Sequence, residues 1–241
     1  MNQPLHYFVS GGSRGLGLEI CRELLSMGYF VSTFARSNTE EVRLLGLAYP
    51  NQFLFSEIDI TNQDVVEKFV AEAEKKLGMI NGLVNNAAIG QDDLLVHMDP
   101  RKIENIVAVN ILGTVNLTKA IVKKMLMGDG GKIIFISSIC SSKGYPGLSI
   151  YSGSKGFMDA FSRSLVVELK RSSISINSIS PGFFASETSS VLSQEQLDQI
   201  KSNTPSGKLT EIADVIATLK YLICAENTNG ANIIIDGGAT S

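Results

Sequence analysis

Short apolar runs alternate with longer amphipathic stretches along the whole chain, and this alternation restricts the fold more than any other feature. Apolar runs of this kind indicate buried strands, and the amphipathic stretches between them indicate helices. Strands that alternate with helices are typical of repeated βα units around a parallel sheet. We therefore predict an α/β fold with a doubly wound, seven-stranded parallel sheet flanked by helices on both faces.

The predicted strands are 6–10, 29–35, 52–58, 82–85, 132–137, 173–179 and 232–235. The predicted helices begin near Gly15, Asn38, Asn62, Arg101, Ile150, Glu187 and Thr210, most of them after a residue that can cap a helix. The apolar spacing extends the helix that begins at Ile150 as far as Arg171.

Length and composition favour one domain, residues 1–241, with one large core. The chain has 241 residues, 44% hydrophobic and 19% charged, and it shows no repeat or linker. Its net charge of -3, with both signs interspersed, gives no footprint for nucleic acid. The N-terminus shows no signal-peptide pattern, and no run of about 20 uninterrupted apolar residues follows. We expect a cytoplasmic protein with no membrane segment.

The cysteine and histidine residues predict neither disulfides nor a metal site. Cys21, Cys140 and Cys224 are odd in number, far apart and set in apolar patterns, so we expect buried free thiols. Cys140 lies near the pocket that we predict around Tyr151 and Lys155, and it is a candidate for modification. His6 and His97 are isolated, and no cluster has the spacing of metal ligands, so we expect no catalytic metal.

A glycine-rich turn follows the first predicted strand and opens the first helix. Glycines in such a turn permit positive φ and let the backbone approach a pyrophosphate, which the helix N-terminus attracts. The spacing is G-x-x-x-G-x-G, a variant of the commoner dinucleotide motif, and an ordinary glycine-rich βα turn is the alternative. The candidate cofactor-binding residues here are Gly11, Ser13, Arg14, Gly15, Leu16 and Gly17.

The end of the second strand favours NADP(H) over NAD. An acidic residue there holds a ribose 2′-hydroxyl, whereas an arginine accommodates a 2′-phosphate. This chain has Arg36 and Ser37, and Arg14 in the glycine turn could contact the same phosphate. Glu40 and Glu41 follow closely, but we interpret them as first-turn acids of the next helix.

Two further strand ends carry candidate cofactor contacts. Asp59, at the end of the third strand, or the adjacent backbone at Ile60 could meet the adenine amino group. The alternative for Asp59 is a cap for the helix near Asn62. Asn86 and Ala87 follow the fourth strand, which lies beside the first in a doubly wound sheet and therefore borders the ligand crevice.

Tyr151 and Lys155 form the candidate proton-transfer pair. Four residues apart on a helix, they share one face. A phenol titrates near pKa ~10, and a nearby ammonium together with the first turn of a helix would lower that pKa. Tyr151 is then a tuned general acid or base. The alternative is an ordinary tyrosine at a helix start beside a surface lysine.

With Ser138 preceding this pair, and with VNILGT around Asn110, the chain resembles the short-chain dehydrogenase/reductase family over nearly its whole length. The resemblance implies a Rossmann-type fold and a ketone reductase. It implies that Ser138 binds the substrate carbonyl, that Tyr151 donates the proton, and that Lys155 holds the nicotinamide ribose and lowers the Tyr151 pKa. Asn110 would support a proton relay through water.

The chain departs from the family pattern at two places. The family's NNAG is NNAA here, and its PG-x-x-x-T continues from Pro181 and Gly182 with serine in the last place. The cofactor contacts that the resemblance implies in this segment are Pro181, Gly182, Phe184 and Ser186. Thr188 replaces Ser186 if the lid is one residue longer. The substrate lid is expected at about 183–202.

Within the family the chain is most similar to bacterial 3-oxoacyl-[acyl-carrier-protein] reductases, which implies NADPH-dependent reduction of a β-keto thioester in fatty acid or polyketide-type synthesis. The alternatives are another small carbonyl or secondary alcohol, or a non-catalytic NADP(H)-binding sensor. A homotetramer packed through helices near 101–127 and 150–171 is implied. An acyl carrier protein is acidic, and its candidate docking residues are Lys119, Lys123, Lys124, Lys170 and Arg171, with solvated helix ends as the alternative.

Overall fold

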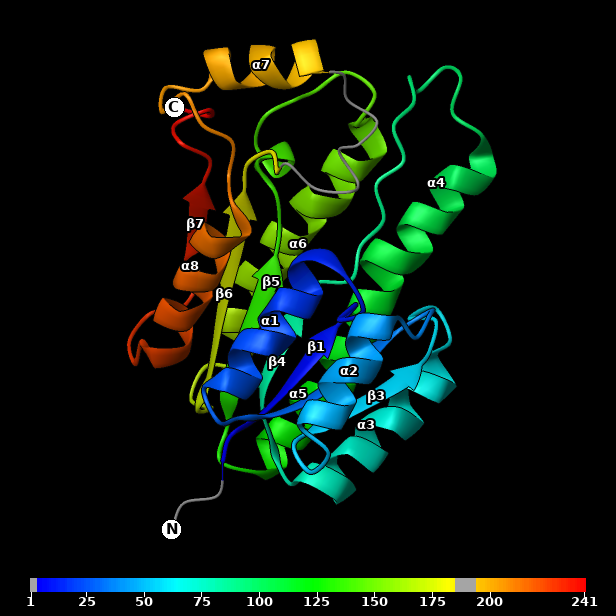
Figure 1. Ribbon diagram of the computed structural model, residues 1–241, viewed down its shortest axis with the longest axis vertical. Helices are drawn as coiled ribbons and strands as arrows, with labels where there is room; N and C mark the ends of the chain where they lie inside the picture. The colour runs from blue at the N-terminus through cyan, green and yellow to red at the C-terminus, as the bar shows by residue number, and fades with distance from the viewer. Residues whose placement is uncertain (1–3, 185–193) are drawn as a thin grey trace.

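Seven parallel strands form one sheet in the order β3-β2-β1-β4-β5-β6-β7 (Figure 1). This computed structural model describes residues 4–184 and 194–241. The strands are β1 His6–Ser10, β2 Phe30–Ala35, β3 Phe53–Glu57, β4 Ile80–Asn85, β5 Gly131–Ile136, β6 Ile174–Pro181 and β7 Asn232–Ile235. The chain order reverses between β1 and β4, which makes the sheet doubly wound. The predicted fold class is confirmed.

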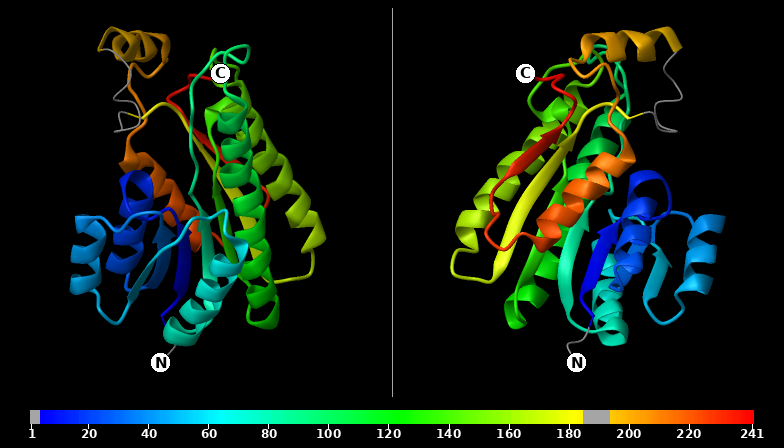
Figure 2. Two further views of the ribbon diagram at one scale, coloured as in Figure 1. Left: turned by 90° about the vertical axis from the view of Figure 1, so that its right-hand side faces the viewer. Right: turned by 60° about the vertical axis from the view of Figure 1, so that its left-hand side comes forward.

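Helices cover both faces of the sheet (Figure 2). On one face pack α1 Gly15–Ser26, α2 Glu40–Ala48 and α8 Ile212–Cys224. On the other pack α3 Gln63–Leu77, α5 Thr114–Met127 and α6 Ser149–Glu168. The remaining helical segments are α4 Pro100–Ile106, the π-helical η1 Val107–Gly113, the 3-10 turn η2 Ile139–Ser141 and α7 Gln194–Asn203. In Figure 1, α7 lies beyond the carboxyl ends of the strands.

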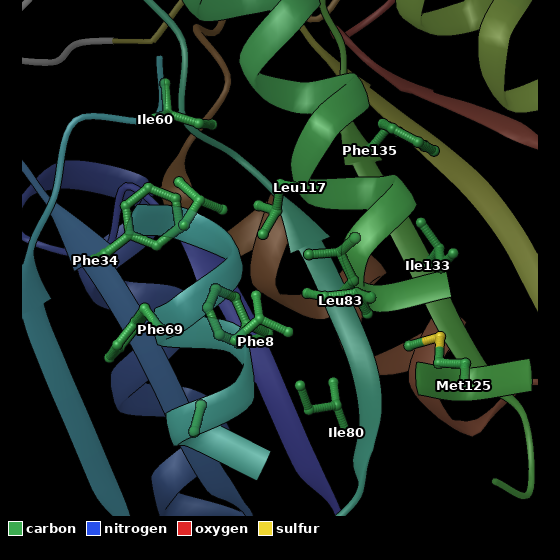
Figure 3. Packing of buried hydrophobic residues seen from close by; sticks show 14 of the residues in the cluster. Phe8, Phe34, Ile60, Phe69, Ile80, Leu83, Leu117, Met125, Ile133 and Phe135 are labelled. Carbon is green, nitrogen blue, oxygen red and sulfur yellow. The ribbon is translucent and has the colours of Figure 1, made fainter. Parts of the chain in front are cut away.

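The core lies on both sides of the central strands. Phe8 of β1 contacts Phe34 of β2 and Phe69 of α3, with ring centroids 6.0 and 5.5 Å apart (Figure 3). Leu83 of β4 and Leu117 of α5 extend this layer and are fully buried. Burying one such side chain contributes about 1.5–3 kcal/mol. Because both faces are buried in this way, the residues in the middle of β1, Tyr7, Phe8 and Val9, are all apolar and buried.

Several boundaries differ from the predicted ones, for local reasons. The helix predicted for 150–171 ends at Glu168, and Arg171 has a φ of 72°, which no right-handed helix allows. The helix predicted near Asn38 begins at Glu40 because the Thr39 side chain accepts a hydrogen bond from the Val42 N–H. The helix predicted near Thr210 begins at Ile212, after a capping box. The start predicted near Glu187 lies outside the described residues.

The helix expected near 101–127 consists of α4, η1 and α5 in continuous succession. By length and composition alone, the 28 residues Pro100–Met127 could cross a membrane, and half of the most apolar window is buried inside the protein. Leu117, Ile121 and Met125 on this helix belong to the core described above. Packing against the sheet accounts for the apolar residues on that side.

Gly82 in β4 lies against the ring of Tyr7, and replacing it should destabilise the fold. A Cβ at position 82 would lie 2.1 Å from Tyr7 Cδ1, and the ring is buried and stacked on Tyr29. Gly82→Ala should lower the free energy of unfolding by about 1–3 kcal/mol in urea denaturation. As the control, Gly46→Ala in α2 meets only ordinary contact with Phe53 at 3.8 Å and should raise it by roughly 0.5–1 kcal/mol. Equal effects of the two substitutions would contradict the predicted clash.

His6 is buried at the start of β1 and should make stability depend on pH. Its Nδ1 lies 2.9 Å from the Gly78 carbonyl oxygen and its Nε2 2.8 Å from Ser32 Oγ. Burial lowers the pKa of His6 from 6.5 to about 4, against the opposing effect of the Gly78 hydrogen bond. The unfolded chain therefore binds a proton below pH 6.5 that the folded protein does not bind until about pH 4.

The stabilisation from His6 is therefore fully present above pH 6.5 and is lost as the pH falls toward 4. The loss should be on the order of 3 kcal/mol, measured as the free energy of unfolding against pH. His6→Gln should flatten this dependence, whereas the matched substitution at the exposed His97 should leave it in place. A profile for His6→Gln as steep as that of the wild type would refute the assignment.

Candidate active site

The candidate site lies at the edge of the sheet where the parallel strands end. The glycine turn follows β1, Asn86 follows β4, Ser138 follows β5, and Pro181 is the last residue of β6. Because all seven strands are parallel, these positions share one edge, and the strand order reverses there between β1 and β4, which is where open α/β sheets bind ligands. The sheet topology thus gathers most of the predicted site residues.

The glycine turn has a shape that only glycine permits at its close contacts. Gly11 and Gly15 have φ angles of 72° and 53°. A Cβ at Gly17 would lie 2.2 Å from the Gly11 carbonyl oxygen and 2.5 Å from Asn86 Nδ2. Arg14 is the N-cap of α1, and no side chain in the described part of the chain caps the first turn, so the N–H groups of that turn are available to an anion. These residues fit the phosphates of a dinucleotide.

Ser10 and Asn86 connect the glycine turn to the end of β4. Ser10 Oγ accepts hydrogen bonds from the N–H groups of Asn86 and Ala87, both at 3.0 Å. Asn86 Nδ2 donates to the carbonyl oxygens of Ser10 and Gly11, at 3.0 and 3.2 Å. Ser10 was not among the site residues predicted from the sequence, although its place at a strand end beside the glycines was a usable signal.

The predicted 2′-phosphate residues are exposed at the end of β2. Arg36 and Ser37 lie directly after this strand, and Arg14 is also exposed. Within the described ranges, neither arginine forms an ion pair. Glu40 and Glu41 lie in the first turn of α2 as predicted, and Glu40 binds Arg43, with Arg43 Nε donating at 2.9 Å.

Asp59 lies two residues beyond the carboxyl end of β3, and it does not cap α3. The strand before it ends at Glu57, and the cap of α3 is Asn62, whose side chain accepts a hydrogen bond from the Val65 N–H. Asp59 Oδ1 instead accepts hydrogen bonds from the N–H and hydroxyl of Thr61, at 2.9 and 2.8 Å. Asp59 is exposed, whereas the neighbouring Ile60 is buried in the core.

Ser138, Tyr151 and Lys155 come together as the sequence predicted. Ser138 is the half-buried N-cap of η2, and its Oγ accepts a hydrogen bond from the Cys140 N–H at 3.2 Å. Tyr151 lies in the first turn of α6 and Lys155 one turn later, with Nζ 5.7 Å from the Tyr151 ring centroid. Lys155 is 3% exposed, and its Nζ donates to the Ile136 carbonyl oxygen at 2.7 Å.

The electrostatics of the pair differ from the prediction. Burial raises the pKa of Tyr151; Cys140 acts in the same direction, and the Ser138 side chain opposes it. Burial lowers the pKa of Lys155 to about 8, and Asp159 opposes this shift. The expectation that Lys155 lowers the Tyr151 pKa is wrong for this structure, because desolvation dominates and the ammonium binds the Ile136 carbonyl oxygen. Tyr151 is a neutral phenol, ready to donate a proton.

Asn110 lies in the middle of η1 and is fully buried. Its Oδ1 accepts a hydrogen bond from the Ile89 N–H at 2.8 Å. Its Nδ2 donates to the Ile89 carbonyl oxygen at 2.9 Å and to Ser154 Oγ at 3.0 Å. The side chain therefore holds the segment after β4 against α6. Ser154, which was not among the residues predicted from the sequence, is the partner on α6.

The segment after β6 packs against Thr210 and Tyr145. A Cβ at Gly182 would lie 2.7 Å from Thr210 Oγ1, and Phe184 forms a parallel bridge with Thr210. The ring of Phe183 packs edge-on against that of Tyr145, with centroids 5.1 Å apart. Ser186 and the alternative Thr188 lie outside the described residues. Of the lid predicted for 183–202, the structure describes the first two residues and most of α7.

Four of the five basic residues proposed for carrier docking, Lys123, Lys124, Lys170 and Arg171, lie away from this site. Lys123 and Lys124 lie near the end of α5, and Lys124 Nζ binds Glu74 at 2.7 Å. Lys170 and Arg171 follow the end of α6, which at 1.5 Å per residue lies roughly 25 Å along the helix from Tyr151. Within one chain, these basic residues lie at the opposite edge of the sheet.

The three cysteines are free thiols with different environments. Cys21 and Cys140 are buried as predicted, but Cys224, the last residue of α8, is exposed. Burial raises the pKa of Cys21 to about 12 and raises that of Cys140 as well, which makes both poor nucleophiles. In the part of the chain that the structure describes, no group of three or more His, Cys, Asp or Glu side chains could hold a metal ion.

The fold and the site together are those of a nucleotide-dependent oxidoreductase. Comparison with known proteins identifies the family. The family model for short chain dehydrogenase matches residues 6–197. The 3-oxoacyl-[acyl-carrier-protein] reductase of Homo sapiens is 33% identical over 230 residues, 95% of each chain. The corresponding reductase of Haemophilus influenzae is 32% identical over 232 residues, 95% of this chain and 96% of that one. This protein belongs to the short-chain dehydrogenase family and is an oxidoreductase of that family.

A solved structure is similar over almost the whole chain. The gluconate 5-dehydrogenase of Burkholderia cenocepacia, crystallised with NADP and tartrate, is 25% identical with a TM-score of 0.92. The similarity covers 99% of this chain and 96% of that one.

Proposed function

We propose that the protein is an NADPH-dependent reductase that transfers a hydride to a ketone, with the β-keto group of a 3-oxoacyl thioester on an acyl carrier protein as substrate. The observation that carries the proposal is the neutral phenol of Tyr151 beside Ser138 and Lys155 at the carboxyl edge of the sheet. Relatives named as 3-oxoacyl-[acyl-carrier-protein] reductases support the substrate class.

The roles follow from the chemistry of each group. NADPH supplies the hydride when bound. The Ser138 hydroxyl donates a hydrogen bond to the substrate carbonyl oxygen, and the Tyr151 phenol gives that oxygen its proton. Lys155 binds the nicotinamide ribose through donors that Ile136 leaves free. Because the Asn110 side chain is already hydrogen bonded, its share of the proton relay falls to its backbone carbonyl.

The preference for NADPH rests on the end of β2. Arg36 is exposed there and Arg14 is exposed in the glycine turn, both without acidic partners among the described residues, and Glu40 is occupied by Arg43. Two guanidinium groups of this kind suit a 2′-phosphate, which they bind through paired N–H donors. The related gluconate 5-dehydrogenase was crystallised with NADP, which supports the same preference.

Apolar side chains near the site support an acyl substrate. Tyr145 and Phe183 form an aromatic pair on one side. Leu94, Leu95 and Val96 are exposed on the loop before α4, which connects to the Tyr145 segment through a hydrogen bond from the Asp93 N–H to the Gly147 carbonyl oxygen at 3.0 Å. An acyl chain would remove some of this apolar surface from water.

The assembly and setting of the protein are part of the same proposal. A homotetramer would pack through α5 and α6, where Leu126 and Val167 are exposed. Burying such apolar side chains between copies is favourable. The protein would act in the cytoplasm, in fatty acid or polyketide-type synthesis, with an acyl carrier protein as partner.

A second candidate function is the reduction of a small polar ketone, or the oxidation of the matching secondary alcohol. The similarity to gluconate 5-dehydrogenase favours this alternative, because a sugar acid carries no long apolar tail.

The experiment that separates the two follows NADPH absorbance with an acetoacetyl thioester and with a keto-sugar acid. We expect turnover of the thioester with a kcat/KM at least about tenfold higher, a difference of about 1.4 kcal/mol. Tyr151→Phe should lower kcat by roughly 10²–10⁴-fold, the typical share of general acid catalysis, and should leave NADPH binding by fluorescence unchanged. Tyr145→Phe is the matched control and should retain turnover.

Turnover of the keto-sugar acid alone would reject the thioester assignment. Undiminished reduction by Tyr151→Phe would reject Tyr151 as the proton donor.

Arg36 should determine the choice between the two nicotinamide cofactors. Arg36→Ala should lower the ratio of kcat/KM for NADPH over NADH by roughly 10- to 100-fold, because a charge-assisted contact to the 2′-phosphate is lost. The measurement is initial rates with both cofactors at one fixed ketone concentration. Arg43→Ala, which removes an exposed arginine already bound to Glu40, should leave the ratio unchanged. An unaltered ratio for Arg36→Ala would mean that Arg36 does not contact the phosphate.

A further inference from the structure

Two buried groups of opposite charge lie one turn apart on α6. Lys155 is 3% exposed and Asp159 is 8% exposed. Of the three donors on Lys155 Nζ, one is used by the Ile136 carbonyl oxygen, and no other hydrogen bond to Nζ is present in residues 4–184 and 194–241. Asp159 Oδ2 accepts a hydrogen bond from Asn232 Nδ2 at 3.3 Å, whereas Asp159 Oδ1 is buried and has no hydrogen-bond partner among the described residues.

Buried charges are costly unless a nearby group of opposite charge compensates them. Side chains four residues apart on a helix have Cβ atoms about 5–6 Å apart, close enough for strong interaction in a desolvated site. The Asp159 carboxylate favours the charged form of Lys155. Each group therefore reduces the desolvation cost of the other.

The other groups around Lys155 do not replace this carboxylate. Tyr151 on the same helix is a neutral phenol, and the Cys140 thiol on η2 has a raised pKa, so it is protonated near neutral pH. The neighbouring strands offer the Ile136 carbonyl and the Asn232 amide, which carry no charge. Asp92, on the loop before α4, acts on Tyr151 and Cys140. Asp159 is the acid that acts on Lys155 itself.

We propose that Asp159 is a positioning residue: its carboxylate holds Lys155 as an ammonium, bound to the Ile136 carbonyl oxygen and directed past the Tyr151 ring, without contacting substrate or cofactor. This inference rests on the proposed function, in which the charged Lys155 binds the nicotinamide ribose.

The consequence is a pH limit on the reaction. Burial lowers the pKa of Lys155 to about 8 even with Asp159 present. Without the Asp159 carboxylate, Lys155 would lose its proton at lower pH. Cofactor binding and reduction, which both need the charged lysine, would then decline at a lower pH than in the wild type.

The experiment compares pH profiles of kcat/KM for NADPH-dependent reduction of the acetoacetyl thioester. Asp159→Asn removes the charge and keeps an oxygen that can accept from Asn232. Its alkaline limb should move to lower pH by about one unit, with roughly a fivefold loss at pH 8 and little loss at pH 6. Asp159→Glu should restore the wild-type limb. If Asp159→Asn fails to fold, Asp159→Leu, an apolar replacement of similar size, takes its place and should show the same shift of the alkaline limb.

Asn232→Ala is the matched control, because it breaks the hydrogen bond to Asp159 and leaves every charge in place. Its thermal midpoint should fall while its alkaline limb stays with the wild type. Superimposable limbs for the wild type and Asp159→Asn would overturn the proposal. Equal displacement in Asn232→Ala would also overturn it, because the role would then be structural.

A second measurement separates this inference from the substrate assignment. NADPH binding, followed by fluorescence against pH, does not depend on which ketone is reduced. If the wild type fails to reduce the thioester but Asp159→Asn shifts the pH dependence of NADPH binding, the substrate assignment is wrong and the role of Asp159 stands. If the thioester is reduced and neither pH profile shifts, the role of Asp159 is wrong.

Discussion

The burial of both faces of one parallel sheet is the constraint on which the rest of the structure depends. Phe8 and Leu83 can be fully buried in β1 and β4 because α3 and α5 cover the strands on one face and α1 and α8 cover the other. Parallel strands require a crossover helix after nearly every strand, and those helices cover the two faces of the sheet. All strands then end at the same edge, so the polar residues that follow them gather there.

Desolvation at that edge sets the chemistry of the site. Tyr151 and Lys155 are both shifted toward their neutral forms by burial, so the phenol holds its proton and the lysine depends on compensation from its surroundings. The segments that shape the site are themselves held by buried and partly buried hydrogen bonds of Asn86, Asn110 and Ser10. A reactive group that is fixed and desolvated in this way needs little reorganisation of its surroundings when it reacts.

Much of this arrangement could be predicted from local pattern. The alternation of apolar runs and amphipathic stretches predicted seven parallel strands, and the spacing of Tyr151 and Lys155 predicted a shared helical face. The end of α6 at Glu168 was not predicted, because the apolar periodicity continues past it and only the backbone at Arg171 departs from the helix. The sign of the Tyr151 pKa shift was also missed. The sequence predicts that Lys155 lies near Tyr151. Burial of the phenol and the bond from Lys155 to the Ile136 carbonyl oxygen decide that desolvation, and not the ammonium, has the larger effect on the Tyr151 pKa.

The sequence by itself determined the class of fold, the functional residues that follow each strand, and the reaction type. These depend on local properties of the chain: its apolar periodicity, its glycine spacing, and the pattern of Ser138, Tyr151 and Lys155. The tertiary structure alone decided that Asn110 holds Ile89 and Ser154, that Asp159 is buried with a free oxygen beside Lys155, and that the basic ends of α5 and α6 lie far from Tyr151. These facts depend on distances between residues remote in the chain, and on water excluded by packing, neither of which any single segment encodes.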